Sequence, residues 1–388
     1  MTVSIVGWSH LPFGRLDNLG LENLIVSAAT QALNHAGIGG DQVDGVWLGN
    51  LNGGFSPEIF ASSLALEADS GLRWKPANRL ENACASGSAA IYAACDAIES
   101  GRTRVALVIG AEKMTGVSGS EITRILGNCA HPSDVSQIAG GFPGIFGQMA
   151  QQYFAAWGEH SATLARIAAK NHANGVANPW AQMRRDLGFE FCNTVSEKNP
   201  LIAAPLRKTD CSLVSDGAAA LVLASDEAIR DFPRAVNIRA RAQVNDLLPL
   251  SGRQAVTFEG PRRAWSNALE NAGCSIDDLS FAEVHDCFTI AELLSYEAMN
   301  LAPAGQGHTL LEEGVVMRDG RLPVNVSGGL KAKGHPIGAT GVSMHVISAM
   351  QLCQEAGEMQ LPDPVLAGVF NMGGAAVANY VSILERVQ

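Results

Sequence analysis

The sequence has few aromatic residues (6%) and few charged residues (17%) for its 388 positions. Because 47% of the residues are apolar, this composition excludes a disordered or fibrous chain and leaves ample material for a large core. The 41 glycines indicate helices and strands whose backbones approach closely. A chain of this length exceeds one ordinary core, so we expect two packed domains or a duplicated fold.

An excess of basic residues and long apolar runs are also missing. Lys and Arg number 27 against 38 Asp and Glu, a net charge of −11, which disfavours a nucleic-acid partner. No run approaches the roughly 18 apolar residues of a membrane span, and the N-terminus, MTVSIVGWSHLPFG, lacks the pattern of a signal peptide. We therefore expect no membrane span and a cytoplasmic location.

Closely spaced cysteines are absent. The eight cysteines lie far apart with no C-x-x-C pair, which argues against a zinc site and against a small disulfide framework. A reducing compartment fits this usage best, and we expect no bound metal.

One segment occurs twice. ALNHAGIGGDQVDGVWLGN, from Ala32, resembles ALENAGCSIDDLSFAEVHD, from Ala268, at an offset of 236 residues. Each copy predicts a helix, a glycine stop, an acidic turn and a short strand. Because short apolar runs alternate with alanine-rich helical stretches, the chain predicts βαβ units with sheets buried under helices.

A second, shorter pair sets DGAAALVLA against GGAAVANYV, which aligns Gly217 with Gly374 at an offset of 157 residues. The difference between the two offsets implies a net insertion of 79 residues in the first half. We expect a first half over residues 1–226, containing an inserted loop subdomain at about 116–205, and a second half over residues 227–388.

Cys84 is the first candidate for chemistry. In NRLENACASGSAAIYAACDAIESG it lies where an extended segment ends and a helix of small residues begins. A helix N-terminus lowers the pKa of a thiol and favours the thiolate. The alternative is an inert, packed cysteine.

His335 is the second candidate. In NVSGGLKAKGHPIGATG, flanking glycines and Pro336 predict a tight loop that would hold an imidazole where it can take a thiol proton. A helix-capping histidine is the alternative. Lys331 and Lys333 bring positive charge nearby, or form a solvated basic turn.

The third candidate is EVHDCFTIAELLSYEAM, where a predicted strand runs into a helix. His285, Asp286 and Cys287 occupy the junction, a place typical of an active-site mouth. A metal pair of His285 and Cys287 is the weaker alternative, because it lacks further ligands.

Together these motifs resemble a known family. Asn82-Ala-Cys-Ala-Ser-Gly, Gly334-His-Pro-Ile-Gly-Ala-Thr-Gly and Asn371-Met-Gly-Gly resemble the thiolase superfamily, and His285-Asp-Cys-Phe resembles its sterol-carrier-protein thiolase-like branch. The resemblance spans nearly the whole chain. It implies an α/β, duplicated thiolase fold, in which two α-β-α-β-α halves share a five-layered core with an inserted loop subdomain, and a homodimer or a dimer of dimers.

The resemblance also implies roles. Cys84 would be the nucleophile that accepts an acyl group, His335 the base that activates it, and Cys287 a second acid/base. His285, which stands where other thiolases have asparagine, would help hold an oxyanion-binding water. The backbone N–H groups of Cys84 and Gly373 would form the other oxyanion hole.

Further roles follow from the same resemblance. Ser212 would contact the pantetheine arm of coenzyme A, although Leu213 replaces a glycine often found beside that serine. Many thiolases carry their second cysteine where this chain has Asn371, so here that role falls to Cys287. CoA and acyl-CoA would be substrates, with no tightly bound cofactor.

Three functions compete. The leading one is a CoA-dependent acyltransferase of lipid metabolism that cleaves 3-oxoacyl-CoA with CoA, or condenses acyl-CoA units, by a ping-pong mechanism. A β-ketoacyl synthase of the same fold would pair its cysteine with His/His or His/Asn instead. The third is an acyl-CoA-binding or aldolase-type subunit that works with a small zinc-ribbon/OB-fold partner.

Overall fold

Residues 2–387 are described by the computed structural model, and within them nine strands form one mixed sheet. The strand order is β3-β2-β4-β7-β1-β8-β11-β10-β9. The strands are β1 (Val3–His10), β2 (Gly45–Gly49), β3 (Ala77–Leu80), β4 (Val105–Glu112), β7 (Gly217–Ser225), β8 (Val236–Asn245), β9 (Phe281–Val284), β10 (Leu366–Gly373) and β11 (Ala378–Arg386). A short pairing of β1 with β8 joins the five strands of the first half to the four of the second.

The two halves repeat one topology. In each, a strand is followed by a helix, a parallel inner strand, a second helix and a final antiparallel pair. The order β1, α1 (Leu21–Ala36), β2, α2 (Ser86–Glu99), β4, β7 thus corresponds to β8, α8 (Glu259–Ala272), β9, α12 (Ile337–Leu352), β10, β11. The predicted duplication is confirmed.

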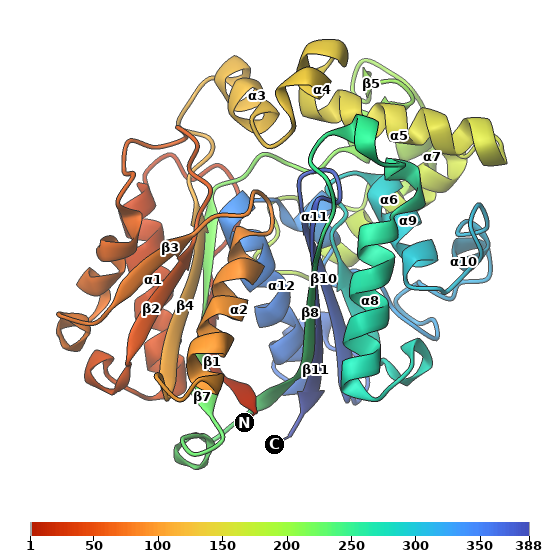
Figure 1. Ribbon diagram of the computed structural model, residues 1–388. Coiled ribbons are helices and arrows are strands. Elements are labelled where there is room, and N and C mark those ends of the chain that lie inside the picture. The colour runs from red at the N-terminus through yellow and green to blue at the C-terminus, as the bar shows by residue number, and fades with distance from the viewer. Residues whose placement is uncertain (1, 388) are drawn as a thin grey trace.

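The elements stack in five layers (Figure 1). Helix α1 covers the outer face of the first-half strands and α8 that of the second-half strands, while α2 and α12 pack together between the two groups. All residues of α12 are buried, as expected for a helix that is apolar around its whole circumference. The α-β-α-β-α order predicted for the fold is confirmed.

A long segment separates β4 from β7. It contains α3 (Gly119–Gly127), α4 (Pro132–Gln137), α5 (Gly141–Trp157), α6 (Ser161–Gly175), α7 (Gly188–Asn193) and the hairpin β5 (Leu201–Ala203) and β6 (Leu206–Arg207). In Figure 1, α3, α4 and α5 lie across the top of the sheets. The remaining helices are α9 (Thr289–Ala298), α10 (Thr309–Glu312) and α11 (Gly329–Lys333).

One part of the repeat alignment is wrong. Gly217 begins β7, but Gly374 lies in the turn before β11, whose first residue is Ala378. Both stretches are rich in glycine and alanine, so similarity of composition aligned a turn with a strand. The net insertion of 79 residues, which rested on this alignment, is wrong for the same reason.

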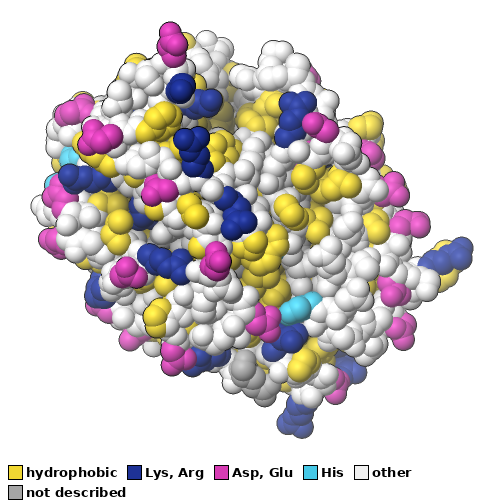
Figure 2. Space-filling model, turned by 180° about the vertical axis from the view of Figure 1, so that it is seen from behind, with side chains coloured by type: hydrophobic (Ala, Val, Ile, Leu, Met, Phe, Trp, Pro, Cys, Tyr) yellow, Lys and Arg dark blue, Asp and Glu magenta, His cyan; other side chains and the backbone are white. Residues whose placement is uncertain are grey.

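No helix within residues 2–387 is long and apolar enough to cross a bilayer. On the face shown in Figure 2, basic and acidic side chains are interspersed rather than gathered into one band.

Candidate active site

Three loops that are far apart in the sequence bring the predicted residues together. One precedes α2, one follows β9, and one links α11 to α12. The Sγ of Cys84 and one ring nitrogen from each of His285 and His335 all lie within 4.8 Å of one another. The two imidazole rings are nearly perpendicular, with centroids 5.0 Å apart.

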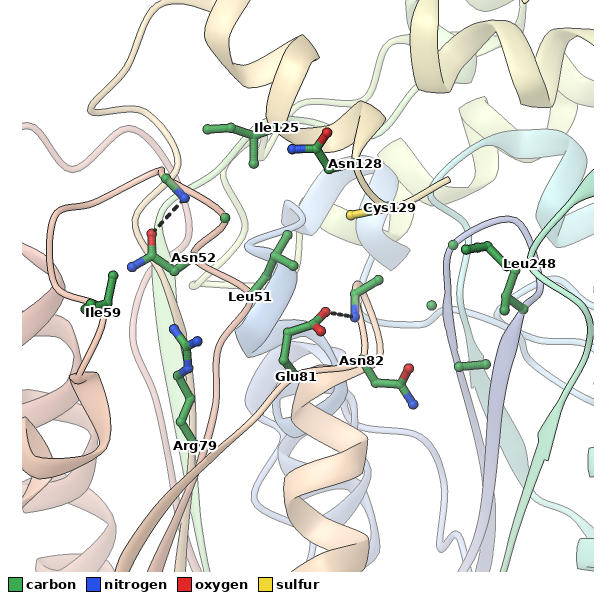
Figure 3. A pocket seen from close by; sticks show the side chains of 17 residues that line it. Leu51, Asn52, Ile59, Arg79, Glu81, Asn82, Ile125, Asn128, Cys129 and Leu248 are labelled. Atoms are coloured by element: carbon green, nitrogen blue, oxygen red, sulfur yellow. Dashed lines mark hydrogen bonds between the residues drawn. The ribbon is translucent and has the colours of Figure 1, made fainter. Parts of the chain in front are cut away.

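The loop that carries Cys84 is strained. Ala83 has φ = +50°, a conformation that residues with a Cβ avoid and that is common at functional sites. The Glu81 carboxylate accepts a hydrogen bond from the Ala83 N–H at 2.6 Å, as Figure 3 shows. From the other side Gly373 touches the loop, where a Cβ would lie 2.4 Å from the Asn82 carbonyl oxygen. The neighbouring elements therefore fix the nucleophile's position.

The expected thiolate at Cys84 is wrong for the free protein. Burial raises the pKa of this thiol to about 12, and the charges of Glu112 and Glu81 act in the same direction. Backbone N–H groups of Gly374 and of Cys84 itself lower the pKa by less. Helix α2 begins only at Ser86, so the helix terminus does not outweigh desolvation. The thiol stays protonated at neutral pH and needs a base.

His335 is oriented to be that base. Its Nδ1 lies 2.6 Å from Thr340 Oγ1, and this hydroxyl donates to the Pro336 carbonyl at 2.9 Å. Because the hydroxyl proton is used there, Thr340 accepts from His335 Nδ1–H, which leaves Nε2 with a free lone pair. Burial, with a smaller effect of Lys333, lowers the pKa of His335 to about 3, so the ring is neutral.

Lys331 and Lys333 do not form a solvated turn. Both are buried, with 2% and 0% of their surface exposed, and Lys333 Nζ has no hydrogen-bond partner among the described residues. Burial lowers the pKa of both ammonium groups. The charge of Lys333 therefore acts on the active site from within the core.

Cys287 lies in the same buried region. Burial raises the pKa of its thiol well above the usual value, and the charges of Cys84 and Asp286 add to the effect. Its backbone carbonyl accepts a hydrogen bond from the Ser212 N–H at 2.9 Å, which holds the predicted pantetheine-contacting segment against the predicted acid/base.

A cavity of about 130 Å³ connects these groups to the surface. Cys84, Cys287, His335 and Ser212 all line it, with mostly apolar neighbours and no Lys or Arg. The remaining lining residues are Met114, Leu126, Cys129, Phe142, Pro143, Ile202, Cys211, Leu213, Val214, Phe288 and Ile337.

Gly373 lines a different cavity. This second space, about 660 Å³, lies on the other side of the Cys84 loop and is lined by Arg79, Glu81 and Asn82 among others (Figure 3). The turn after β10 directs the N–H of Gly374, the next residue, to the Cys84 sulfur. An oxyanion role for the Gly373 N–H stays a prediction.

His285 is held by a residue whose role the motifs did not reveal. Asn371 Nδ2 lies 2.9 Å from His285 Nδ1 and also donates to the Cys84 carbonyl at 3.2 Å. Thr340 was missed as well, although it belongs to the same GHPIGATG motif as His335. Spacing within that motif could have suggested Thr340, whereas Asn371 comes from a separate strand.

The donor set of one thiol and two imidazoles is also one that Zn²⁺ accepts. Asn371 occupies the lone pair of His285 Nδ1, so the neutral ring carries its proton on Nε2. A nitrogen that keeps its proton cannot ligate a metal. The hydrogen bonds of this site therefore favour acyl chemistry over metal binding.

The sequence matches two protein-family models, "Thiolase, N-terminal domain" over residues 3–227 and "Thiolase C-terminal domain-like" over residues 242–386. It is 33% identical to an acetyl-CoA acetyltransferase of Methanothermobacter thermautotrophicus over 99% of both chains. It is 31% identical to sterol carrier protein 2 of Homo sapiens, a match that covers 92% of this chain and 66% of that protein.

Among solved structures, an Ltp2-ChsH2(DUF35) aldolase superposes with a TM-score of 0.85, covering 99% of this chain and 98% of that chain. The sequence identity is 19%, so this likeness concerns the fold.

Proposed function

We propose, from the premise that this chain belongs to the thiolase family, that it moves acyl groups between CoA thioesters through an acyl-enzyme on Cys84. The two family matches establish the membership, confirm the resemblance carried by the motifs, and make the chain a CoA-dependent acyltransferase. One observation carries the finer proposal: Cys84, His335 and Cys287 line one buried cavity although they come from three separate loops.

In the first half-reaction, Cys84 Sγ attacks the thioester carbonyl and passes its proton to Nε2 of His335. The carbon–sulfur bond to CoA then breaks. The CoA thiolate takes a proton from the Cys287 thiol, which leaves an acyl-Cys84 thioester, an imidazolium and a Cys287 thiolate. Covalent catalysis of this kind divides one difficult reaction into two acyl transfers.

In the second half-reaction, written for condensation, the Cys287 thiolate removes a proton from the α-carbon of acetyl-CoA. The enolate attacks the acyl-Cys84 carbonyl and forms the new carbon–carbon bond. Cys84 leaves as a thiolate and recovers its proton from His335, so the starting protonation states return. Cleavage of a 3-oxoacyl-CoA by CoA is the reverse sequence, and it uses Cys287 first as an acid.

A direct experiment tests this proposal. Purified protein is mixed with acetyl-CoA, and its intact mass is compared with that of Cys84→Ala. Wild type should gain one acetyl group and the variant none. Turnover is then followed with acetoacetyl-CoA plus CoA by loss of thioester absorbance. Absence of both the adduct and turnover would contradict the proposal.

A second arrangement, a complex with a small zinc-ribbon/OB-fold protein, is favoured by the cavity's surroundings. No basic residue lines it to hold the phosphates of CoA. Two lining residues at its mouth, Ile202 and Val214, are 46% and 39% exposed, an apolar surface that a partner could cover. In this arrangement the partner binds the nucleotide end of CoA, and the complex works as an acyl-CoA-binding or aldolase-type assembly.

The substrate itself distinguishes the two arrangements. If a partner binds the nucleotide end, the isolated chain should acylate equally fast with acetyl-CoA and with S-acetylpantetheine, which lacks the nucleotide. A kcat/KM that is much higher for acetyl-CoA would show that this chain binds the nucleotide itself, and would count against the partner.

We also propose a homodimer, alone or paired into a dimer of dimers, built on the free edge of the sheet. Strand β3 ends the strand order, and a strand edge is a ready site for pairing with another chain. Large apolar side chains beside it are exposed: Ile59 by 80%, Phe60 by 76% and Trp74 by 84%. The cytoplasmic location stays a prediction.

A further inference from the structure

We propose that Asn371 is a positioning residue that fixes the tautomer of His285, so that His285 Nε2–H serves directly as the hydrogen-bond donor for the enolate oxygen. This inference rests on the acyl transfer proposed above. It replaces the water that His285 was expected to hold with the ring itself.

The parallel pairing of two strands places the pair. Strands β9 and β10 run side by side with Val284 opposite Phe370. The next residue of each chain segment, His285 and Asn371, therefore emerges at the same edge of the sheet. Both side chains are buried, with 1% and 0% of their surface exposed.

The orientation of the Asn371 amide is determined by its other partners. The backbone carbonyl of Cys84 can only accept a hydrogen bond, so the NH₂ group must face it. On the opposite side, Ser88 Oγ donates to Asn371 Oδ1 at 2.8 Å. A flipped amide would lose both bonds, so an N–H is what reaches His285 Nδ1 at 2.9 Å.

The ring of His285 then has one possible neutral form. Its Nδ1 lone pair accepts from Asn371, and burial, with the nearby His335, lowers the pKa of the imidazole well below the usual value. The single ring proton must therefore sit on Nε2. This nitrogen is buried and has no hydrogen-bond partner within the part of the chain that the structure describes. Buried donors without partners are rare, and are expected where a ligand supplies the acceptor.

The two histidines of the site consequently hold opposite tautomers. Thr340 leaves His335 with a lone pair on Nε2, while Asn371 leaves His285 with a proton there. One ring can take the proton of Cys84, and the other can donate to an oxygen that becomes negative. Such a donor strengthens its bond as the enolate forms, and no proton is transferred.

A double-mutant cycle tests the inference. Asn371→Asp introduces a carboxylate that accepts a hydrogen bond from His285 Nδ1, which moves the ring proton to Nδ1 and leaves a lone pair on Nε2. His285→Asn keeps an N–H donor that has no ring tautomer to be reversed. The rate of acetoacetyl-CoA cleavage is measured for wild type, both single variants and the double variant.

We expect Asn371→Asp to reduce kcat in the His285 background about 100-fold more than in the His285→Asn background, with little change in KM, because a lost oxyanion donor costs about this factor. The charge that Asp adds near Cys84 acts in both backgrounds and cancels in the comparison. Equal losses in the two backgrounds would mean that Asn371 only supports the Cys84 loop, and would overturn the inference.

Two further measurements keep the result interpretable. Ser88→Ala removes the other hydrogen bond of Asn371 without touching His285, so it should leave the ring tautomer unchanged. Nitrogen-15 NMR of histidine-labelled protein, assigned with His285→Asn, should show His285 protonated on Nε2 in wild type and on Nδ1 in Asn371→Asp. A wild-type ring protonated on Nδ1 would overturn the inference even if a variant folds poorly.

Acylation separates this inference from the proposed function. Failure of wild type to form acetyl-Cys84 from acetyl-CoA would remove the proposed acyl transfer. Normal acylation combined with equal effects of Asn371→Asp in the two backgrounds would leave the acyl transfer intact and remove only the role of Asn371.

Discussion

Thr340 Oγ1 lies 2.6 Å from Nδ1 of His335 and donates its own proton to the Pro336 carbonyl. The base therefore owes its tautomer to a hydroxyl within its own helix-entry loop. Thr340→Val keeps the side-chain shape but removes the acceptor, so His335 can carry its proton on Nε2, where it cannot accept from Cys84. We expect acetylation of Cys84 to slow about 10- to 100-fold, measured as the appearance of the acyl-enzyme by rapid-quench mass spectrometry.

Thr340→Ser is the matched control. It retains the hydroxyl and should acylate within a few-fold of wild type. If the valine and serine variants slowed equally, packing of the methyl group would be responsible and the tautomer argument would fail.

The raised pKa of Cys84 predicts how the free thiol reacts. Because burial raises that pKa to about 12, the thiolate fraction should grow about tenfold for each pH unit between pH 7 and 10. Alkylation by iodoacetamide, followed at Cys84 by peptide mass spectrometry, should rise in proportion. A rate that is already maximal at pH 7 would show a thiolate in the free protein, as a helix N-terminus alone would give.

The residues of the site could be found from sequence because each lies in a short local motif. Cys84, His335 and the His285–Cys287 segment are bounded by glycines or by a strand-to-helix junction, and such features are read over a few residues. The five-layered fold followed from the repeat in the same way, except where glycine- and alanine-rich stretches misaligned a turn with β11.

The electrostatics could not be found in this way. The protonation state of Cys84 depends on how completely the surrounding layers exclude water, and Lys333 proved to be buried although its motif reads as a basic turn. The contact of Asn371 with His285 joins residues 86 positions apart and exists only because β9 and β10 pair in one register. Desolvation and strand register are properties of the assembled core, so no local pattern encodes them.

Cys287→Ala separates the two half-reactions. Acetyl-Cys84 should still form, since Cys84 and His335 remain, but overall cleavage of acetoacetyl-CoA should fall by about 100-fold or more because a general acid/base is lost. Intact mass reports the adduct and thioester absorbance reports turnover. Full turnover in this variant would exclude Cys287 as the acid/base.

Lys333 should set the acid limit of activity. Its buried charge lowers the pKa of His335, so Lys333→Met should raise that pKa. A histidine with a higher pKa is protonated, and lost as a base, at a higher pH. The acid limb of the pH profile of kcat/KM for acylation should therefore move upward in the variant. An unchanged limb, in a variant that folds normally, would mean that desolvation alone keeps His335 neutral.

The free edge at β3 predicts the effect of a charge placed there. Phe60 is 76% exposed beside this edge, an exposure that is costly for an aromatic ring unless another surface covers it. Phe60→Asp should shift the protein from dimer to monomer, measured by light scattering after size exclusion. Val365→Asp is the control, because Val365 is also exposed, by 44%, but directly precedes β10, an inner strand of the opposite half of the sheet. A wild type that is monomeric at micromolar concentration, or a dimer that tolerates Phe60→Asp, would exclude this edge as the dimer interface.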